Sequence, residues 1–203
     1  MVIFTEGVAE PSEHAAMASM FETRKAIFVD ILKWNVPVID GRFEVDQYDN
    51  ERACYVLVND ELGKHLGSAR LLPTTGPHIL GDLYPELCAN GVPRGSRTFE
   101  ITRFCLGLRG GARLRLATRN RLVSALVTIA LERGIERFTG VAEMGWLQQI
   151  LAFGWDCSPL GPPRQIGRSM LGALVIEISP RTPQLLAENG IWAFEVEPMA
   201  QAA

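Results

Sequence analysis

Glu100 and Arg103 stand three residues apart in an otherwise apolar segment, residues 99–105 (FEITRFC). A carboxylate can take a proton from a nucleophile, and a guanidinium can hold a carboxylate through two parallel hydrogen bonds. In a regular strand the two side chains point to opposite faces, whereas a bulge changes this alternation. The segment is also compatible with an edge strand that exposes both charges, because burial of either charge would require a partner.

Three carboxylates, Glu44, Asp46 and Asp49, lie within six residues and beside Tyr48. Such a group could bind a metal ion, or an ammonium or sulfonium cation. The spacing does not match an EF-hand loop, which needs ligands at set positions through to a final glutamate. A solvated turn explains the same residues, so the segment is either a cation site or a polar loop.

A third candidate group belongs to the helix expected over residues 14–34. Arg24 and Phe28 share one face of this helix, because residues four apart are neighbours, and Trp34 ends the segment. A guanidinium and two aromatic rings could hold a carboxylate and an adenine ring. An amphipathic helix that packs its aromatic side chains explains the same pattern.

Basic side chains gather where residues 109–113 (RGGAR) precede a second expected helix, residues 114–133. Backbone N–H groups at a helix start can bind phosphate, but the spacing fits neither a Walker A motif nor a dinucleotide fingerprint. The cluster consists of Arg113, Arg115, Arg119 and Arg121. It is either a solvated helix face or a docking surface for an acidic partner.

Composition limits the classes to which the chain can belong. Its 203 residues, 47% hydrophobic and 21% charged, are typical of a globular protein with a sizeable core. The net charge of -3 gives no case for nucleic-acid binding, and no apolar run is long enough to span a membrane. The first residues are not expected to be a secretory signal, because they have no basic n-region and carry acidic residues early. Four widely spaced cysteines favour free thiols in a reducing cytoplasm, with no structural metal site.

The elements expected from periodicity predict an α+β fold built on a mixed sheet. Strands are expected over residues 53–58, 65–72, 98–107, 137–141, 171–178 and 193–196, and a third helix over 142–153. On the helix at 114–133, one side should carry Leu116, Leu122, Leu126 and Ile129. No linker divides the chain, so residues 1–203 are predicted to form a single domain.

Taken in order, these features resemble the acyl-homoserine-lactone synthases, the family that makes quorum-sensing autoinducers. The resemblance covers roughly residues 17–180. It rests on Arg24, Phe28 and Trp34, then Glu44, Asp46 and Asp49, then residues 67–74 (GSARLLPT), then Glu100 and Arg103. The resemblance implies an αβα sandwich similar to that of GCN5-related N-acetyltransferases, with helices on both faces of a mixed sheet.

The resemblance also implies a reaction with two substrates. One is S-adenosylmethionine, a substrate rather than a cofactor, and the other is an acyl thioester on acyl carrier protein or on coenzyme A. The amine attacks the thioester carbonyl and gives an amide. The methionine carboxylate then displaces the sulfur at its own γ-carbon, so the lactone closes and methylthioadenosine leaves.

Residue roles follow from the same resemblance. Glu100 is the first choice for the group that takes the amine proton, and Arg103 and Asp46 complete the expected catalytic set. The expected S-adenosylmethionine site comprises Arg24, Phe28, Trp34, Asp46, Asp49, Arg70 and Arg103. The expected acyl pocket comprises Phe104, Thr139, Val141 and Trp146. Carrier-protein docking is assigned to Arg113, Arg115 and Arg119.

Two other functions remain open at this point. A related N-acyltransferase would form an amide without lactonisation and would not need the acidic loop. A non-catalytic sensing module would bind S-adenosylmethionine or acyl groups without turnover, although the presence of Glu100, Arg103 and both loop aspartates argues against it. Gly140, Glu143 and Gly145 depart from the family pattern, so the acyl-chain preference is open.

Overall fold

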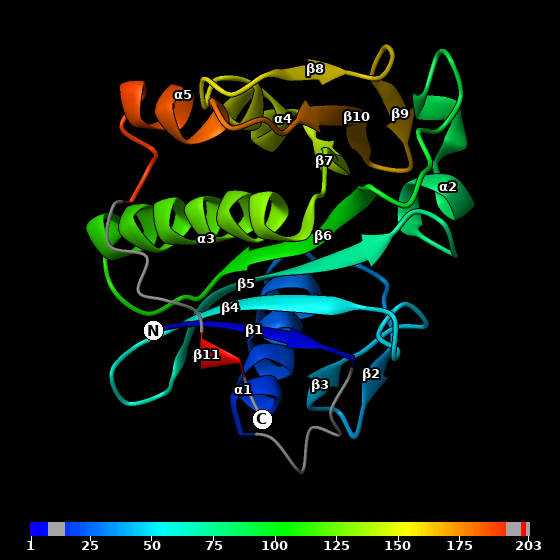
Figure 1. Cartoon of the computed structure of the whole chain (residues 1–203). Helices are drawn as coiled ribbons and strands as arrows, with labels where there is room; N and C mark the ends of the chain where they lie inside the picture. Colours follow the sequence, from blue (N-terminus) through cyan, green and yellow to red (C-terminus); the bar gives the residue numbers. More distant parts are fainter. Residues whose placement is uncertain (8–14, 194–199, 202–203) are drawn as a thin grey trace. The chain divides into compact units, whose positions relative to one another are not determined.

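The computed structural model of the chain describes residues 1–7, 15–193 and 200–201, which Figure 1 shows in colour. The chain contains two compact units, and each is described by itself. Unit 1 comprises Met1–Arg70, Arg103–Ala125 and the described part of Ala193–Ala203. Unit 2 comprises Leu71–Thr102 and Leu126–Trp192. The prediction of one domain over residues 1–203 stays a prediction.

Unit 1 is built on strands in the order β11-β1-β4-β5-β6. Their bounds are β1, Val2–Glu6; β4, Cys54–Asn59; β5, His65–Pro73; β6, Thr98–Leu106; and β11, Ala200–Gln201. Strand β1 pairs antiparallel with β4, from Val2↔Val58 to Glu6↔Cys54, and parallel with β11. The sheet is therefore mixed, as predicted. The last residues of β5 and the first residues of β6 belong to unit 2.

Helices lie on both faces of the unit 1 strands (Figure 1). These are α1, Ala15–Arg24, which continues as the π-helix η1, Lys25–Ile31, and the first half of α3, Ala112–Arg133. A Cβ at Gly67 of β5 would lie 2.8 Å from Thr118 of α3. The next residue, Ser68, points to the other face and contacts the buried Cys105. Burial raises the pKa of the Cys105 thiol and the charge of Arg24 lowers it, so the end of α1 lies near this second face.

Unit 2 has the strand order β6-β7-β10-β8, with β9 paired to β10. The bounds are β7, Arg137–Glu143; β8, Cys157–Pro159; β9, Arg164–Ile166; and β10, Ser169–Glu177. Strand β6 runs parallel to β7, whereas β7 and β10 are antiparallel from Leu171↔Glu143 to Glu177↔Arg137. This sheet is mixed as well.

The helices of unit 2 also cover two faces. They are α2, Ile79–Leu83; the 3-10 helix η2, Pro85–Leu87; α4, Met144–Leu151; and α5, Thr182–Glu188. Gly172 of β10 faces Leu147 of α4, whereas its neighbour Ala173 packs in one cluster with Leu80 and Leu87. Because consecutive strand residues point to opposite faces, α4 and α2 cover opposite faces of β10. The predicted αβα arrangement is confirmed.

Most predicted elements are present, and the differences have local causes. The strand at 65–72 and the helix at 114–133 agree within two residues with β5 and α3. Strands β1, β8 and β9 and helix α5 were not predicted, because they are short. Leu116 was expected on the buried side of α3 but is 51% exposed, since the buried hydrophobic stripe begins six residues later, at Leu122. The strand expected at 193–196 lies largely outside the described residues.

Among the residues that the structure describes, no helix is long and apolar enough to cross a membrane.

Candidate active site

The acidic segment forms an ordered loop in unit 1 that begins at the two-stranded hairpin β2, Val38–Ile39, and β3, Phe43–Glu44. Glu44 ends β3 and is fully buried. The Tyr48 N–H donates to Asp46 Oδ1 at 2.8 Å, and the Asp46 N–H donates to Asp49 Oδ2 at 2.9 Å. These side-chain-to-backbone bonds fix the loop in one turn conformation.

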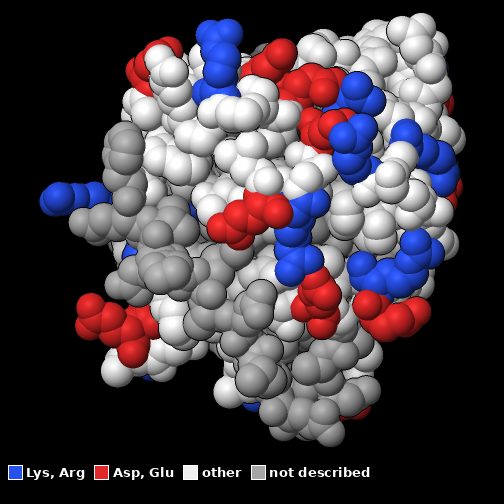
Figure 2. All heavy atoms as spheres, viewed as in Figure 1, with Lys and Arg blue, Asp and Glu red and all other residues white. Residues whose placement is uncertain are grey.

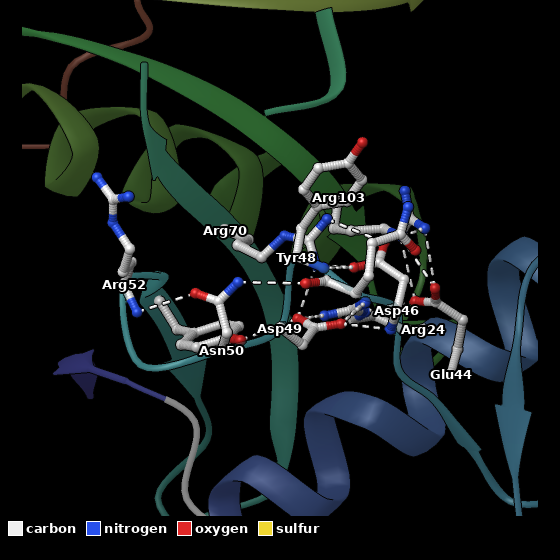
Figure 3. A network of polar contacts seen from close by, with 11 residues as sticks. Arg24, Glu44, Asp46, Tyr48, Asp49, Asn50, Arg52, Arg70 and Arg103 are labelled. Atoms are coloured by element: carbon white, nitrogen blue, oxygen red, sulfur yellow. Dashed lines mark hydrogen bonds and ion pairs between the residues drawn. The ribbon is translucent and has the colours of Figure 1, made fainter. Parts of the chain in front are cut away.

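Two arginines hold this loop from other elements of unit 1 (Figure 3). Arg24, the last residue of α1, donates to Glu44 Oε2 at 2.6 Å and forms a two-bond pair with Asp49 at 2.9 and 2.8 Å. Arg70 of β5 binds both oxygens of Asp46, at 2.6 and 3.1 Å, and lies 2.8 Å from Asp49 Oδ1. The loop is therefore tied to a helix and a strand by planar, two-point contacts.

Arg103 completes this group of charges from an irregular position in β6. Its backbone has φ +50°, in the left-handed region, which costs about 1–2 kcal/mol for a residue with a side chain. Burial along β6 alternates through Glu100 and Thr102 and then resumes at Cys105, one residue out of phase. The strand is thus not regular at Arg103. The guanidinium donates to Glu44 Oε1 at 2.9 Å and to Asp46 Oδ2 at 2.7 Å.

Two aromatic rings cover the guanidinium of Arg103. Phe28 of η1 and Trp34 stack with centroids 4.7 Å apart and planes 18° from parallel. The Arg103 Cζ lies 5.5 Å from the Phe28 centroid and 5.9 Å from the Trp34 centroid, within cation–π range. Trp34 is 37% exposed and Phe28 is buried, so the Trp34 ring is the accessible part of this stack.

We call the six charged residues Arg24, Glu44, Asp46, Asp49, Arg70 and Arg103 the ion network. Its three positive and three negative groups balance, and each side chain is at most 9% exposed. Burial alone would raise the pKa of Asp49, but Arg24 and Arg70 hold it well below its usual range. Tyr55 donates to Asp49 Oδ1 at 2.9 Å, and burial together with that carboxylate raises the Tyr55 pKa. The network thus joins six buried side chains of opposite charge through ion pairs and hydrogen bonds.

Glu100 lies in unit 2, in different surroundings. It is fully buried, and its Oε1 accepts a 2.9 Å hydrogen bond from the Leu80 backbone N–H. Its register partner on β7 is Thr139, which is also fully buried. Val141, two residues on, packs beside Leu80 in an apolar cluster completed by Leu87, Cys88 and Ala173. A carboxylate thus adjoins an apolar face, where a proton acceptor and an acyl chain could meet.

The other predicted acyl-pocket residues are placed separately. Phe104 belongs to unit 1, whereas Thr139 and Val141 belong to unit 2. Trp146 is on α4, which covers the face of β10 opposite the Val141 cluster, and its ring packs edge-on against Phe153 at 5.9 Å. The acyl-pocket roles of these residues stay predictions.

The predicted docking arginines differ in accessibility. Arg113 and Arg115 are exposed at the start of α3, and three exposed leucines accompany them: Leu108, Leu114 and Leu116, at 53, 40 and 51%. Arg119 is half-buried and donates to Asn120 Oδ1 at 3.1 and 2.8 Å, and burial lowers its pKa. On the face drawn in Figure 2, the described basic and acidic side chains are interspersed.

Sequence reasoning named Glu44 only as one of the three carboxylates of the acidic segment, outside the expected S-adenosylmethionine site, and it assigned no site role to Tyr55, His78 or the Leu80 N–H. Glu44 was detectable, because a residue two positions before Asp46 in an extended segment shares its face. The others had no signal, because nothing in residue type or spacing marks Tyr55 or His78, and the Leu80 N–H belongs to the backbone. Among the described residues, no group of three or more histidine, cysteine or acidic side chains could hold a metal ion.

The chain is similar to known proteins over most of its length. The autoinducer synthase family matches residues 9–183. An acyl-homoserine-lactone synthase of Ralstonia nicotianae is 37% identical over 182 residues, which cover 87% of this chain and 89% of the relative. An isovaleryl-homoserine lactone synthase of Bradyrhizobium diazoefficiens is 31% identical over 83% of this chain and 76% of its own length.

Solved structures show the same likeness. A coenzyme A-dependent acyl-homoserine lactone synthase, crystallised with S-adenosylmethionine and isopentyl-coenzyme A, superposes with TM-score 0.85 and 26% identity over all of this chain and 94% of that one. A putative N-acetyltransferase of Lactobacillus plantarum, at 16% identity and TM-score 0.58 over 88% of this chain and 98% of that one, shows the fold alone.

Proposed function

Because the chain belongs to the acyl-homoserine-lactone synthase family and is an acyltransferase, we propose that it joins S-adenosylmethionine to an acyl thioester and that unit 1 binds the S-adenosylmethionine. The observation that carries this proposal is the ion network beneath the stacked rings of Phe28 and Trp34. It offers a cation, carboxylates and an aromatic surface in one place. These are the groups needed by a ligand with a carboxylate, an ammonium, a sulfonium and an adenine ring.

In this proposal Arg103 holds the methionine carboxylate. Its Nε and Nη2 edge is committed to Glu44 and Asp46, so Nη1 is the part of the fork directed to substrate. Asp46, which is 5% exposed at its side chain, faces the substrate cation. Arg24, Asp49 and Arg70 are more deeply buried and support the site by fixing the acidic loop.

Glu100 takes the proton of the attacking amine, directly or through one water. The neutral amine attacks the thioester carbonyl, and the thiol departs with a proton. Positioning of amine and carbonyl supplies much of the acceleration. A backbone N–H near residues 104–106 is proposed to stabilise the oxyanion.

The second stage closes the lactone. The methionine carboxylate attacks its own γ-carbon, the carbon–sulfur bond breaks, and its electron pair neutralises the sulfonium as methylthioadenosine leaves. Purified protein given S-adenosylmethionine and an acyl thioester series should therefore release lactone and methylthioadenosine in equal amounts. An amide product without methylthioadenosine would instead establish the N-acyltransferase alternative.

Replacement of Arg103 by lysine tests the carboxylate contact. Arg103→Lys keeps the charge but loses the fork, so the KM for S-adenosylmethionine should rise about tenfold. Decarboxylated S-adenosylmethionine lacks the carboxylate, so wild type and variant should use it equally well. Release of the thiol in the amide step measures this use. Arg24→Lys is the matched control: it should lower stability without changing the preference for the carboxylate. A preference that survives Arg103→Lys would refute the assignment.

The acyl donor is proposed to be an acidic carrier protein that docks on the exposed arginines and leucines at the start of α3. A surface with both basic and apolar side chains suits an acidic helix with apolar residues of its own. Coenzyme A is the second candidate, because the relative crystallised with isopentyl-coenzyme A is coenzyme A-dependent.

Charge reversal distinguishes the two donors. Arg113→Glu with Arg115→Glu should raise the KM for acyl carrier protein about tenfold and leave the KM for acyl-coenzyme A within twofold, since electrostatic docking acts mainly on encounter. Lys64→Glu with Arg181→Glu makes the same change of charge elsewhere and should have no effect. Equal loss with both donors would contradict docking at α3.

We further propose a cytoplasmic location, because the four cysteines are free thiols and the cytoplasm keeps thiols reduced. No nucleic-acid partner, membrane span or cofactor is proposed, and S-adenosylmethionine acts as a substrate.

A further inference from the structure

The hydrogen bond to Glu100 comes from the first turn of α2, a helix of five residues. A backbone N–H has no side chain of its own to aim it, so its direction depends on what fixes the turn. His78 immediately precedes the helix, and its carbonyl accepts the Asp82 N–H at 3.0 Å. His78 is therefore the residue at which the chain enters the turn that serves Glu100.

The His78 imidazole is held in a defined state. The residue is fully buried, and its Nδ1 lies 2.8 Å from the Gly76 carbonyl oxygen. A carbonyl only accepts, so Nδ1 carries the proton and Nε2 of the neutral ring does not. Burial lowers the His78 pKa, and the nearby charge of Arg94 lowers it further. The neutral ring thus ties the start of α2 back to Gly76.

Gly81 shows how closely α2 packs on this ring. A Cβ at Gly81 would lie 2.7 Å from His78 Nε2 and 2.5 Å from Arg94 Nη2. Real Cβ atoms do not approach so closely, so no larger residue fits without displacing the imidazole or the guanidinium. The turn is therefore fixed on one side by the Gly76 hydrogen bond and on the other by contact with Gly81.

We propose that His78 is a positioning residue for Glu100, because it fixes the turn from which the Leu80 N–H reaches Glu100 Oε1. The inference rests on the proposed role of Glu100 as proton acceptor. An N–H bond to one oxygen orients the carboxylate and favours its ionised form, in which it can accept a proton from the amine. His78 itself touches no substrate in this proposal.

Two substitutions separate the hydrogen bond from simple packing. His78→Leu fills a similar volume but cannot bond Gly76, whereas His78→Asn offers an amide N–H near the place of Nδ1–H. His78→Leu should slow single-turnover amide formation about tenfold and leave the KM for S-adenosylmethionine within twofold. The slower rate is expected because loss of the Gly76 bond releases the turn, and the Leu80 N–H then no longer donates to the Glu100 carboxylate. It should also move the acidic limb of the rate profile to higher pH. His78→Asn should restore most of the rate.

The Leu80 amide proton provides a readout that does not depend on turnover. Its NMR resonance should lie downfield in wild type, because it donates to a carboxylate, and should move upfield in His78→Leu and in Glu100→Gln. Leu83→Ala, at the exposed end of the same helix, is the control and should leave the resonance and the rate unchanged.

The outcomes separate the inference from the function on which it rests. A wild-type rate for Glu100→Gln would remove Glu100 as proton acceptor, and the inference with it. A slow Glu100→Gln beside a wild-type rate and Leu80 resonance for His78→Leu would overturn the inference alone. Equal loss in His78→Leu and His78→Asn would also overturn it, because the Gly76 bond would then be irrelevant.

Discussion

Buried carboxylates have different hydrogen-bond partners in the ion network of unit 1 and around Glu100 in unit 2. In the network, the oxygens of Glu44 and Asp49 bind guanidinium groups at 2.6–2.9 Å. Glu100 accepts from a neutral backbone N–H and lies beside an apolar cluster. Paired carboxylates lose basicity, because their cations stabilise the charged form.

This difference distinguishes carboxylates that hold the structure together from one that is proposed to accept a proton. A fully paired, buried group of charges orders a loop and fixes directions, but it is a poor proton acceptor because its members are already neutralised. A carboxylate bonded to a backbone N–H in apolar surroundings is better suited to accept a proton. We therefore expect mutations of the supporting residues Arg24, Asp49 and Arg70 to act mainly on stability and mutations around Glu100 mainly on rate.

The largest expected effect is on the rate, from Glu100→Gln. Its carbonyl oxygen can still accept the Leu80 N–H, so the fold should be retained. Amide formation should fall about 1,000-fold, or roughly 4 kcal/mol in activation free energy, because the proton acceptor is lost. Single-turnover assays with S-adenosylmethionine measure the rate, and urea unfolding measures the stability. If Glu100→Gln lost stability but kept its rate, Glu100 would have a structural role instead of the proposed catalytic one.

Asp49→Asn should show the opposite behaviour. It leaves the buried charges of Arg24 and Arg70 without one carboxylate partner, which costs about 3 kcal/mol in the free energy of unfolding. Urea denaturation measures this loss, with Glu22→Gln, at an exposed ion pair on α1, as the control that should change little. Unchanged stability of Asp49→Asn would mean that the network does not hold the loop.

The smallest expected effect concerns acid stability and involves His65 of unit 1. Burial lowers the His65 pKa to about 4, below the usual value near 6.5, so the unfolded chain binds this proton first. The stability is complete above about pH 6.5, falls as the pH drops towards 4, and then levels off. Between pH 7.5 and 5 this group should cost about 2 kcal/mol.

Unfolding free energies of wild type and His65→Phe across that pH range measure the effect. The variant should lack the His65 part of the slope. The loss attributed to Asp49 needs stronger acid, because its lowered pKa keeps it ionised until well below its usual range. Parallel curves for wild type and His65→Phe would show that His65 does not titrate between these states.

Much of the fold could be predicted from the sequence, because periodic burial leaves a direct signal. The apolar stripe of α3 and the run of β5 identified these elements within two residues. Leu116 was placed wrongly, since a stripe predicts which side of a helix is apolar but not where the rest of the protein stops covering it. Short elements such as β8, three residues long, carry too few positions for a pattern.

The candidate site was predicted in part. Residue type and spacing drew attention to Asp46, Asp49 and Arg103. In the structure these residues belong to one group of ion pairs. The left-handed backbone of Arg103 could not be read from the sequence, because an arginine in FEITRFC gives no sign of a positive φ. The alternation of the strand predicted that a regular strand would separate Glu100 from Arg103 and that a bulge would change this, without deciding between the two.

By itself, the sequence determined the order of the charged and aromatic residues, and with it the family and the kind of substrate. It also determined the long helices and strands, since these depend on neighbours three or four residues away or two. Only the tertiary structure decided which charges meet: Arg103 pairs with Glu44 from 59 residues away. It also decided that a backbone N–H serves Glu100. Every residue except proline has such a group, so no residue type identifies it, and only the path of the chain directs it.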